Sequence, residues 1–170
     1  MTSMQGCHWL DILTRPQPFE VQWPGERPWK ARHMLEAPAT LAAAKRAEVE
    51  VGLPLPKEVG LLWDKTDGGI FYKNESGPAW GWRLSPTASF LEFQHKWRRK
   101  FFDDWRSGHL VILELADPSM ALALDTTRGG VYVLEDDRGQ MKPRRVAATV
   151  SEALERLVEA QGGLWWAWGA

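Results

Sequence analysis

Three short apolar segments in the second half of the chain place the strongest limit on its fold. They span residues 109–116, 120–125 and 131–135, and each has the length and composition of a β-strand. The connectors between them, ADPS and TTRGG, have the composition of tight hairpin turns. A further turn, DDRGQ, leads to residues 144–147, which we expect to form an outer strand. The sequence therefore predicts an antiparallel meander.

Helical segments precede, interrupt and follow these strands. The four predicted helices are 41–51, 57–67, 87–106 and a last helix that opens at the capping sequence 149–152 and ends near residue 161. The third carries an apolar stripe at intervals of three and four residues: Phe90, Phe93, Trp97, Phe101 and Trp105. Further strands are expected near 70–73 and 79–84. This order predicts an α+β fold with one mostly antiparallel sheet and about four helices.

The two ends of the chain differ in composition from its centre. Residues 1–37 are rich in proline and tryptophan, which excludes a long helix and favours an irregular arm or a few edge strands. Residues 163–170, GLWWAWGA, form a tryptophan-rich tail that must either cover an apolar patch or present one. We therefore divide the chain into an arm (1–37), an α+β domain (38–162) and a tail (163–170).

Length and composition indicate the size of the domain and the compartment of the protein. A chain of 170 residues is long enough for one ordinary domain and for a sizeable core. The single cysteine, Cys7, rules out an intramolecular disulfide, which fits a reducing compartment. We find no secretory signal and no apolar stretch long enough to cross a membrane. The expected location is cytoplasmic.

The pair Gly68-Gly69 follows a predicted helix and precedes a predicted strand. A phosphate-binding loop has the opposite order, because it needs the N–H groups at a helix N-terminus. We therefore interpret Asp67, Gly68 and Gly69 as the end of a helix, with Gly68 in a left-handed cap. On this basis, replacement of Gly68 by alanine should destabilise the fold by about 1 kcal/mol or more.

Motifs for catalysis, metals and cofactors are not found. The chain has no zinc-ligand spacing, no nucleophile elbow and no dinucleotide fingerprint. The carboxylate pair Asp103-Asp104 fits a solvated helix face, and Glu135-Asp136-Asp137 falls at a hairpin turn, where Asp is favoured for turn geometry. We expect no enzyme activity, no metal and no cofactor.

Nucleic acid is also disfavoured as a partner. The formal net charge is −1, so bulk positive charge cannot drive binding. The cluster 96–100, KWRRK, mixes basic and aromatic residues, but on a helix Trp97 belongs to the apolar stripe and the basic residues fit a solvated face. The triplet 128–130, Arg-Gly-Gly, resembles an RNA-binding motif, but a hairpin turn between two strands explains it better.

The order of features from Glu48 to Gly69 resembles the opening of the SUKH superfamily. There a first helix ends at a glycine, a Leu-Pro connector begins a second helix, and a triplet such as Asn-Gly-Gly follows. The matching residues are Gly52, Leu53-Pro54 and Asp67-Gly68-Gly69, with Asp where Asn is usual. The paired strands in LALDTTRGGVYVLEDD and the closing helix SEALERLVEA are similar too, with Ala153 where an aromatic is usual. The resemblance covers about residues 40–162.

This resemblance implies a non-catalytic binding domain. Bacterial single-domain members are mostly immunity proteins that bind and neutralise a polymorphic or contact-dependent toxin, often a nuclease. Fungal relatives act in the regulation of cell-wall synthesis and signalling. The first hypothesis is thus an immunity protein with a cognate protein toxin, and the alternative is a regulatory or scaffold domain without a toxin partner.

Candidate partner-binding residues follow from the chemistry of protein interfaces. Trp80 and Trp82 are the aromatic candidates, and Glu135, Asp136 and Asp137 are acidic candidates suited to a basic nuclease. For the two tryptophans burial in the core is an equal alternative, since a spacing of two places both on one face of a strand. The oligomeric state stays open between monomer and homodimer.

Overall fold

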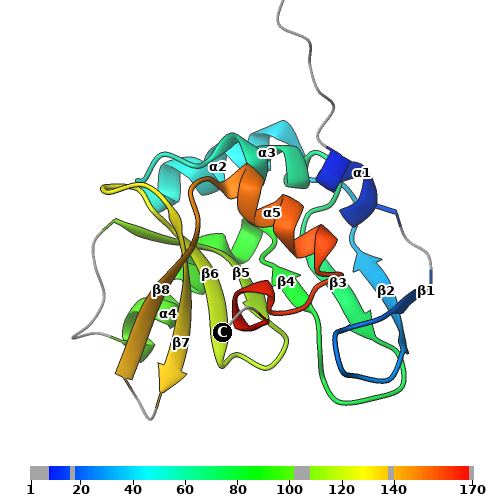
Figure 1. Cartoon of the computed structure of the whole chain (residues 1–170). Coiled ribbons are helices and arrows are strands. Elements are labelled where there is room, and N and C mark those ends of the chain that lie inside the picture. Colours follow the sequence, from blue (N-terminus) through cyan, green and yellow to red (C-terminus); the bar gives the residue numbers. More distant parts are fainter. Residues whose placement is uncertain (1–7, 16–17, 102–107, 138–139, 169–170) are drawn as a thin grey trace, which may run out of the picture.

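The computed structural model of the chain describes residues 8–15, 18–101, 108–137 and 140–168, and it consists of a single antiparallel sheet with helices around it (Figure 1). Within these residues the sheet has eight strands, ordered as in the sequence. They are β1 (Phe19–Val21), β2 (Trp29–Leu35), β3 (Gly69–Asn74), β4 (Trp82–Leu84), β5 (His109–Leu115), β6 (Met120–Asp125), β7 (Val131–Asp137) and β8 (Gln140–Ala147). The predicted α+β fold with an antiparallel meander is confirmed.

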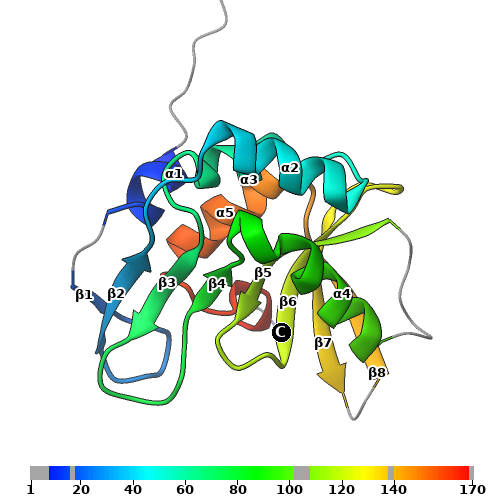
Figure 2. The ribbon, with the colours of Figure 1, turned by 180° about the vertical axis from the view of Figure 1, so that it is seen from behind.

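The helices cover both faces and one end of this sheet. They are α1 (His8–Leu13), α2 (Leu41–Val51), α3 (Lys57–Trp63), α4 (Phe90–Lys100) and α5 (Val150–Glu159), with 3₁₀ turns η1 (Thr87–Ser89) and η2 (Trp165–Ala167). Helix α5 lies in front of the sheet in Figure 1, and α4 lies in front of it in the reverse view of Figure 2. Helices α2 and α3 lie along one end of the strands. None of the helices in the described residues is long and apolar enough to cross a membrane.

Helix boundaries follow the predicted capping chemistry at three positions. The Thr40 hydroxyl accepts a hydrogen bond from the Ala43 N–H, and Gly52 ends α2 in a left-handed conformation with φ 67°. At the start of α5 the Thr149 hydroxyl accepts from the Glu152 N–H. The Glu152 carboxylate accepts in return from the Ala148 N–H, one residue before the cap.

The third helix is shorter than predicted. Its first turn is the 3₁₀ segment η1, and α4 ends at Lys100 instead of Arg106. The apolar stripe is confirmed as far as Phe101, since its side chains up to that residue are buried. Trp105 and the pair Asp103-Asp104 lie outside the described residues.

The interpretation of Asp67-Gly68-Gly69 as a helix end is wrong. Helix α3 stops at Trp63, and its C-cap is Asp64 in a right-handed conformation. The positive φ of Gly68 is confirmed at 98°, and close packing is a second reason for glycine there, because a Cβ would lie 3.0 Å from the Pro86 nitrogen. A Cβ on Gly69 would lie 2.4 Å from the Met34 carbonyl oxygen, so a side chain has no room at that strand start either.

The side chain of Asp67 joins this turn to the next helical segment. Its two carboxylate oxygens accept from the N–H and the hydroxyl of Thr87, at 2.7 and 3.1 Å. Asp67 thereby satisfies a free N–H at the start of η1, as an N-cap residue would. The landmark Leu53-Pro54 lies in the connector between α2 and α3, where Leu53 packs against the core and Pro54 is exposed.

A bulge in the β2–β3 ladder gives one histidine a structural role. The register shifts between Arg32 and Met34, and opposite the shift Tyr72 takes a left-handed conformation with φ 54°. The Tyr72 N–H donates to Nδ1 of His33 at 3.2 Å. Burial lowers the pKa of His33 from 6.5 to about 4, against the opposing effect of a hydrogen bond with the Ile12 backbone. His33 therefore acts as a neutral acceptor inside the fold.

Candidate functional site

The topology gathers four connections at one end of the sheet. In a sequential antiparallel meander the β1–β2, β3–β4, β5–β6 and β7–β8 connections all leave from the same end. We call this surface the hairpin end; in the described residues it comprises loops 22–28, 75–81 and 116–119 and the adjoining ends of β7 and β8. Figure 1 shows it at the bottom, opposite α2 and α3. Partner-binding loops carried on a rigid sheet are a common arrangement for recognition.

An aromatic hollow lies between the first two of these loops. Its volume is about 360 Å³, and three partly buried tryptophans, Trp23, Trp29 and Trp80, line it. The Trp23 ring lies edge-on to Trp29 at 5.0 Å and to Trp80 at 4.8 Å between centroids. The remaining lining comes from Glu26, Arg27, Pro28, Asn74, Ser76, Gly77 and Pro78. This is an apolar centre with a polar rim, as in protein interfaces.

The turn after α5 supplies hydrogen-bond acceptors to the loops that form the hollow. The Trp23 indole N–H donates to the Gln161 carbonyl at 3.4 Å, and the Trp80 indole N–H donates to the Gly162 carbonyl at 3.2 Å. The Gln161 amide oxygen accepts from the Gln22 backbone N–H at 2.8 Å. Gln161 takes a left-handed conformation with φ 50°, which is unusual for a residue with a side chain. Hydrogen bonds therefore attach both loops to the turn after α5.

The two tryptophan candidates have different environments. The indole N–H groups of Trp80 and Trp82 share one acceptor, the Gly162 carbonyl, so both rings lie on the same face as expected. Trp82, however, is 0% exposed and packs at 6.1 Å against Trp166 of the tail. Burial removes Trp82 from any surface that a partner could contact, and only Trp80 stays a surface candidate. The described part of the tail covers an apolar patch of its own domain.

The three acidic candidates lie at the end of β7, near the hairpin end. Because side chains alternate along a strand, Glu135 and Asp136 point to opposite faces of the sheet. Asp136 forms an ion pair with Lys100 of α4 at 3.2 Å, whereas Glu135 is partly buried on the face of Trp82. The backbone of Asp137 pairs with Gln140, and its side chain lies outside the described residues. The structure therefore divides Glu135 and Asp136 between two faces.

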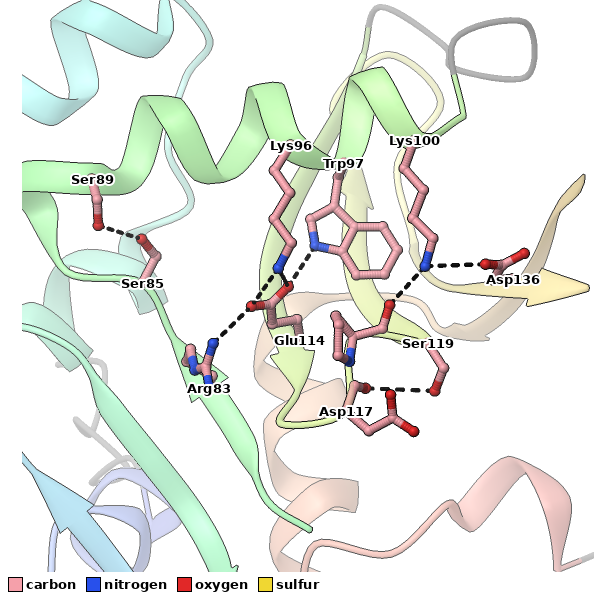
Figure 3. A network of polar contacts seen from close by, with 11 residues as sticks. Arg83, Ser85, Ser89, Lys96, Trp97, Lys100, Glu114, Asp117, Ser119 and Asp136 are labelled. Carbon is pink, nitrogen blue, oxygen red and sulfur yellow. Dashed lines mark hydrogen bonds and ion pairs between the residues drawn. The ribbon is translucent and has the colours of Figure 1, made fainter. Parts of the chain in front are cut away.

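A buried carboxylate on the α4 face organises the basic cluster 96–100 (Figure 3). Glu114 of β5 is 1% exposed and accepts from Lys96 at 2.8 Å and from the Trp97 indole at 2.8 Å. Arg83, its cross-strand neighbour on β4, lies at 3.4 Å. Trp97 is buried, as its place in the stripe predicts, but Lys96 is not a freely solvated residue. It covers a buried charge.

Lys100 links helix α4 to the hairpin end. Its ammonium group donates to the Pro118 carbonyl at 2.7 Å and pairs with Asp136. It thereby connects α4 with the β5–β6 loop and with β7, as Figure 3 shows. Arg99 pairs with Glu92 on the outer side of the helix. Most of the basic cluster is thus occupied by contacts within the chain.

Sequence reasoning missed three residues of this region. The sequence analysis places Trp23 and Trp29 only in the arm, although tryptophans that flank a Pro-Gly turn are a signal for a hairpin with an aromatic face. Glu114 was missed as well, and its signal was a single charge inside the apolar strand HLVILEL. Among the described residues, no group of three or more His, Cys, Asp and Glu side chains could hold a metal ion.

Comparison with known proteins identifies the family. A search of curated proteins finds no match. Residues 38–156 match the SMI1 / KNR4 family (SUKH-1), a span that begins just before α2 and ends within α5. Strands β1 and β2 precede this span but belong to the same sheet. The match covers most of the chain, including the Leu53-Pro54 and Asp67–Gly69 positions, and the chain belongs to the SMI1 / KNR4 family (SUKH-1).

Proposed function

We propose that this protein is a non-catalytic immunity protein, which neutralises a cognate bacterial toxin by binding it. The observation that carries the proposal is the family match over residues 38–156, which supports a protein-interaction role. Immunity is the role that the resemblance to the bacterial members of the superfamily implies. The aromatic hollow adds support, because tryptophan is enriched among the few residues that carry most of the binding energy in protein interfaces.

The proposed contact surface is the hairpin end. From β3, which borders the hollow, to β7, which carries Asp136, there are four strand spacings, or about 19 Å. A standard interface covers about 800 Å² on each partner, which corresponds to a patch about 30 Å across. One toxin surface could therefore contact the hollow and the β7 end together. Binding there would neutralise the toxin by covering its active site or by fixing an inactive conformation.

A two-step experiment tests the proposal. Partners are captured from the native host on the immobilised chain, and each captured protein is then expressed in bacterial cells with and without this chain. We expect one captured protein to stop growth when expressed alone and to lose this toxicity on co-expression. The Trp80→Ala variant should rescue growth less well. Val49→Ala, at a side chain 79% exposed on α2, is the matched control and should rescue fully.

The alternative, a regulatory or scaffold domain, predicts a different result. A captured partner would then bind the chain but would not harm cells when expressed alone. That outcome, found for every captured protein, would contradict the immunity proposal and leave a protein-interaction role. Thermal unfolding of both variants must show that each stays folded at the temperature of the growth assay, so that lost rescue reports lost binding and not unfolding.

A further inference from the structure

A separate cavity of about 250 Å³ lies between helix α1, the end of α5 and the first three strands (Figure 1). Its lining has an apolar part and a polar part. The apolar part is Ile12, Phe19 and Val158, and the polar part is Arg15, His33, Tyr72 and Gln161. Of these residues, only Tyr72 lies within the span 38–156 that matches the family. The cavity is therefore a feature of this chain's own flanking segments.

The Tyr72 hydroxyl is an unused hydrogen-bonding group in this cavity. Tyr72 is 2% exposed, and its ring packs edge-on against His33 and Phe19, at 4.8 and 5.5 Å between centroids. In the described part of the chain the hydroxyl has no hydrogen-bond partner, and burial raises the pKa of the phenol. The hydroxyl oxygen keeps some accessible surface, unlike the Trp29 indole nitrogen, which is closed off from solvent. A molecule in the cavity can therefore reach it.

Two more donors belong to the polar lining. Oε1 of Gln161 accepts from the Gln22 backbone N–H at 2.8 Å, so within the described residues the NH₂ group of Gln161 is left over. Arg15 is exposed, and none of the ion pairs between described residues involves it. The cavity thus combines one cation with two neutral donors.

No carboxylate among the described residues lines the cavity to balance these donors. His33 is neutral at pH 7 because burial lowers its pKa to about 4, and its hydrogen bonds go to the backbone of Tyr72 and of Ile12. A bound cation would be repelled by Arg15 and would find few acceptors. A bound carboxylate would be attracted by Arg15 and would accept from both neutral donors. The lining therefore selects an anion.

Backbone strain marks the same cavity. Tyr72 and Gln161 are the two non-glycine residues with a positive φ in the described chain, at 54° and 50°. Such conformations are costly for residues with a side chain, and they concentrate at ligand sites. Both residues line this cavity, and each brings an unused donor to it.

The volume of the cavity sets the size of the ligand. An apolar cavity of about 150 Å³ holds one benzene molecule. A cavity of about 250 Å³ therefore has room for a ring, or for a branched aliphatic group, together with a short acid side chain. We propose that this cavity binds a small carboxylic acid with an apolar body. The body packs against the three apolar side chains, and the carboxylate accepts hydrogen bonds from Arg15, Tyr72 and Gln161. This site goes beyond the proposed function, since it needs no toxin.

A titration of the ¹⁵N-labelled protein with phenylacetate tests the proposal. At neutral pH this acid is ionised, and its ring suits the apolar lining. We expect saturable shifts of the Gln161 side-chain NH₂ signals and of the Tyr72 and Gly162 backbone amides, with a Kd of about 1 mM or tighter for so small a ligand. Phenylacetamide and phenethylamine are the matched probes, because they keep the ring but carry a neutral amide or a cation. Both should bind at least about threefold more weakly.

Two variants and a control identify the groups involved. Tyr72→Phe keeps the ring and loses the hydroxyl, and it should bind phenylacetate about three- to tenfold more weakly, the effect of one hydrogen bond. Arg15→Gln should weaken binding about two- to fivefold, since an exposed ion pair contributes modestly. Arg46→Gln, at an exposed arginine on α2, should bind as the wild type does. In urea unfolding without ligand, Tyr72→Phe should be at least as stable as the wild type, because the lost hydroxyl has no partner in the described part of the chain.

Four results would overturn the proposal. They are no saturation up to about 10 mM phenylacetate, equal affinity for phenylacetamide, full affinity in Tyr72→Phe, or a loss of stability in that variant, which would give the hydroxyl a structural role. Tighter binding of the peptide Ac-Gly-Gly-Phe than of phenylacetate would assign the cavity to a polypeptide C-terminus instead. Absent phenylacetate binding together with intact toxin neutralisation would contradict this proposal alone. Phenylacetate binding by a chain that neutralises no captured toxin would contradict the proposed function alone.

Discussion

Replacement of Glu114 should reveal how much the buried network on the α4 face stabilises the fold. In Glu114→Ala the Trp97 indole N–H, which is buried, loses its acceptor, and an unsatisfied buried donor costs about 1–3 kcal/mol. Lys96 and Arg83 are 43% and 45% exposed, so water can solvate them and each loses only about 0–1 kcal/mol. Loss of the packed Cγ methylene adds roughly 1 kcal/mol. We therefore expect a loss of about 3 kcal/mol.

Glu114→Gln separates these contributions. The amide has the shape of the carboxylate, and its oxygen can still accept from the Trp97 indole. Only the ion pairs with two half-exposed cations are lost, so the expected cost is about 1 kcal/mol. The difference between the two variants thus measures the buried Trp97 hydrogen bond and the packing around it.

Urea unfolding gives the required free energies, with the m-value checked for constancy between variants. Glu50→Ala, on the exposed side of α2, is the control and should change stability by less than about 0.5 kcal/mol. A double-mutant cycle with Trp97→Phe should give a coupling energy of about 0.5–3 kcal/mol with Glu114→Ala. The reasoning is refuted if Glu114→Ala unfolds within 0.5 kcal/mol of the wild type, or if the cycle shows no coupling.

Three further predictions concern the body of the fold. Gly69→Ala should lower the free energy of unfolding by more than about 2 kcal/mol, because its Cβ meets the Met34 carbonyl. Gly129→Ala has open space around its Cβ and should lower it by about 1 kcal/mol, for the positive φ alone. Equal losses in urea unfolding would be inconsistent with the packing argument. Gly68→Ala should cost about 1 kcal/mol or more, and full stability of that variant would contradict its close contact with Pro86. The pKa of His33 is lowered to about 4 in the folded protein, whereas in the unfolded chain the same side chain is protonated near pH 6.5. The free energy of unfolding should therefore fall by up to about 3 kcal/mol as the pH is lowered from 6.5 to 4, and it should level off below pH 4. In His33→Gln this part of the pH dependence should disappear, and an unchanged profile would assign it to other groups.

The strands of the meander could be predicted because their signals are local. Each of β5, β6 and β7 is a short apolar segment next to a hairpin connector, and neighbouring strands then pair without further information. The caps at Thr40, Gly52 and Thr149 were also predictable, since a cap depends on residues three or four positions apart. The family landmarks belong to the same class of short, local patterns.

The hollow and the buried charge could not be predicted because they depend on tertiary register. Trp29 and Trp80 are far apart in sequence, and they line one hollow because β2 pairs with β3. The pair Gly68-Gly69 shows the same limit. Pro86 lies close to Gly68 and Met34 lies close to Gly69, and both neighbours come from distant segments of the chain. The local pattern predicts the positive φ of Gly68 correctly, but it places that residue at a helix end, whereas α3 ends at Trp63.

Hydrogen–deuterium exchange of the complex with the captured partner would test the central claim most directly. If a protein partner binds at the hairpin end, binding slows exchange in loops 22–28 and 75–81. The exposed face of α2, at the opposite end, then exchanges as in the free protein. Slowed exchange along α2, with both loops exchanging as in the free protein, would contradict the account.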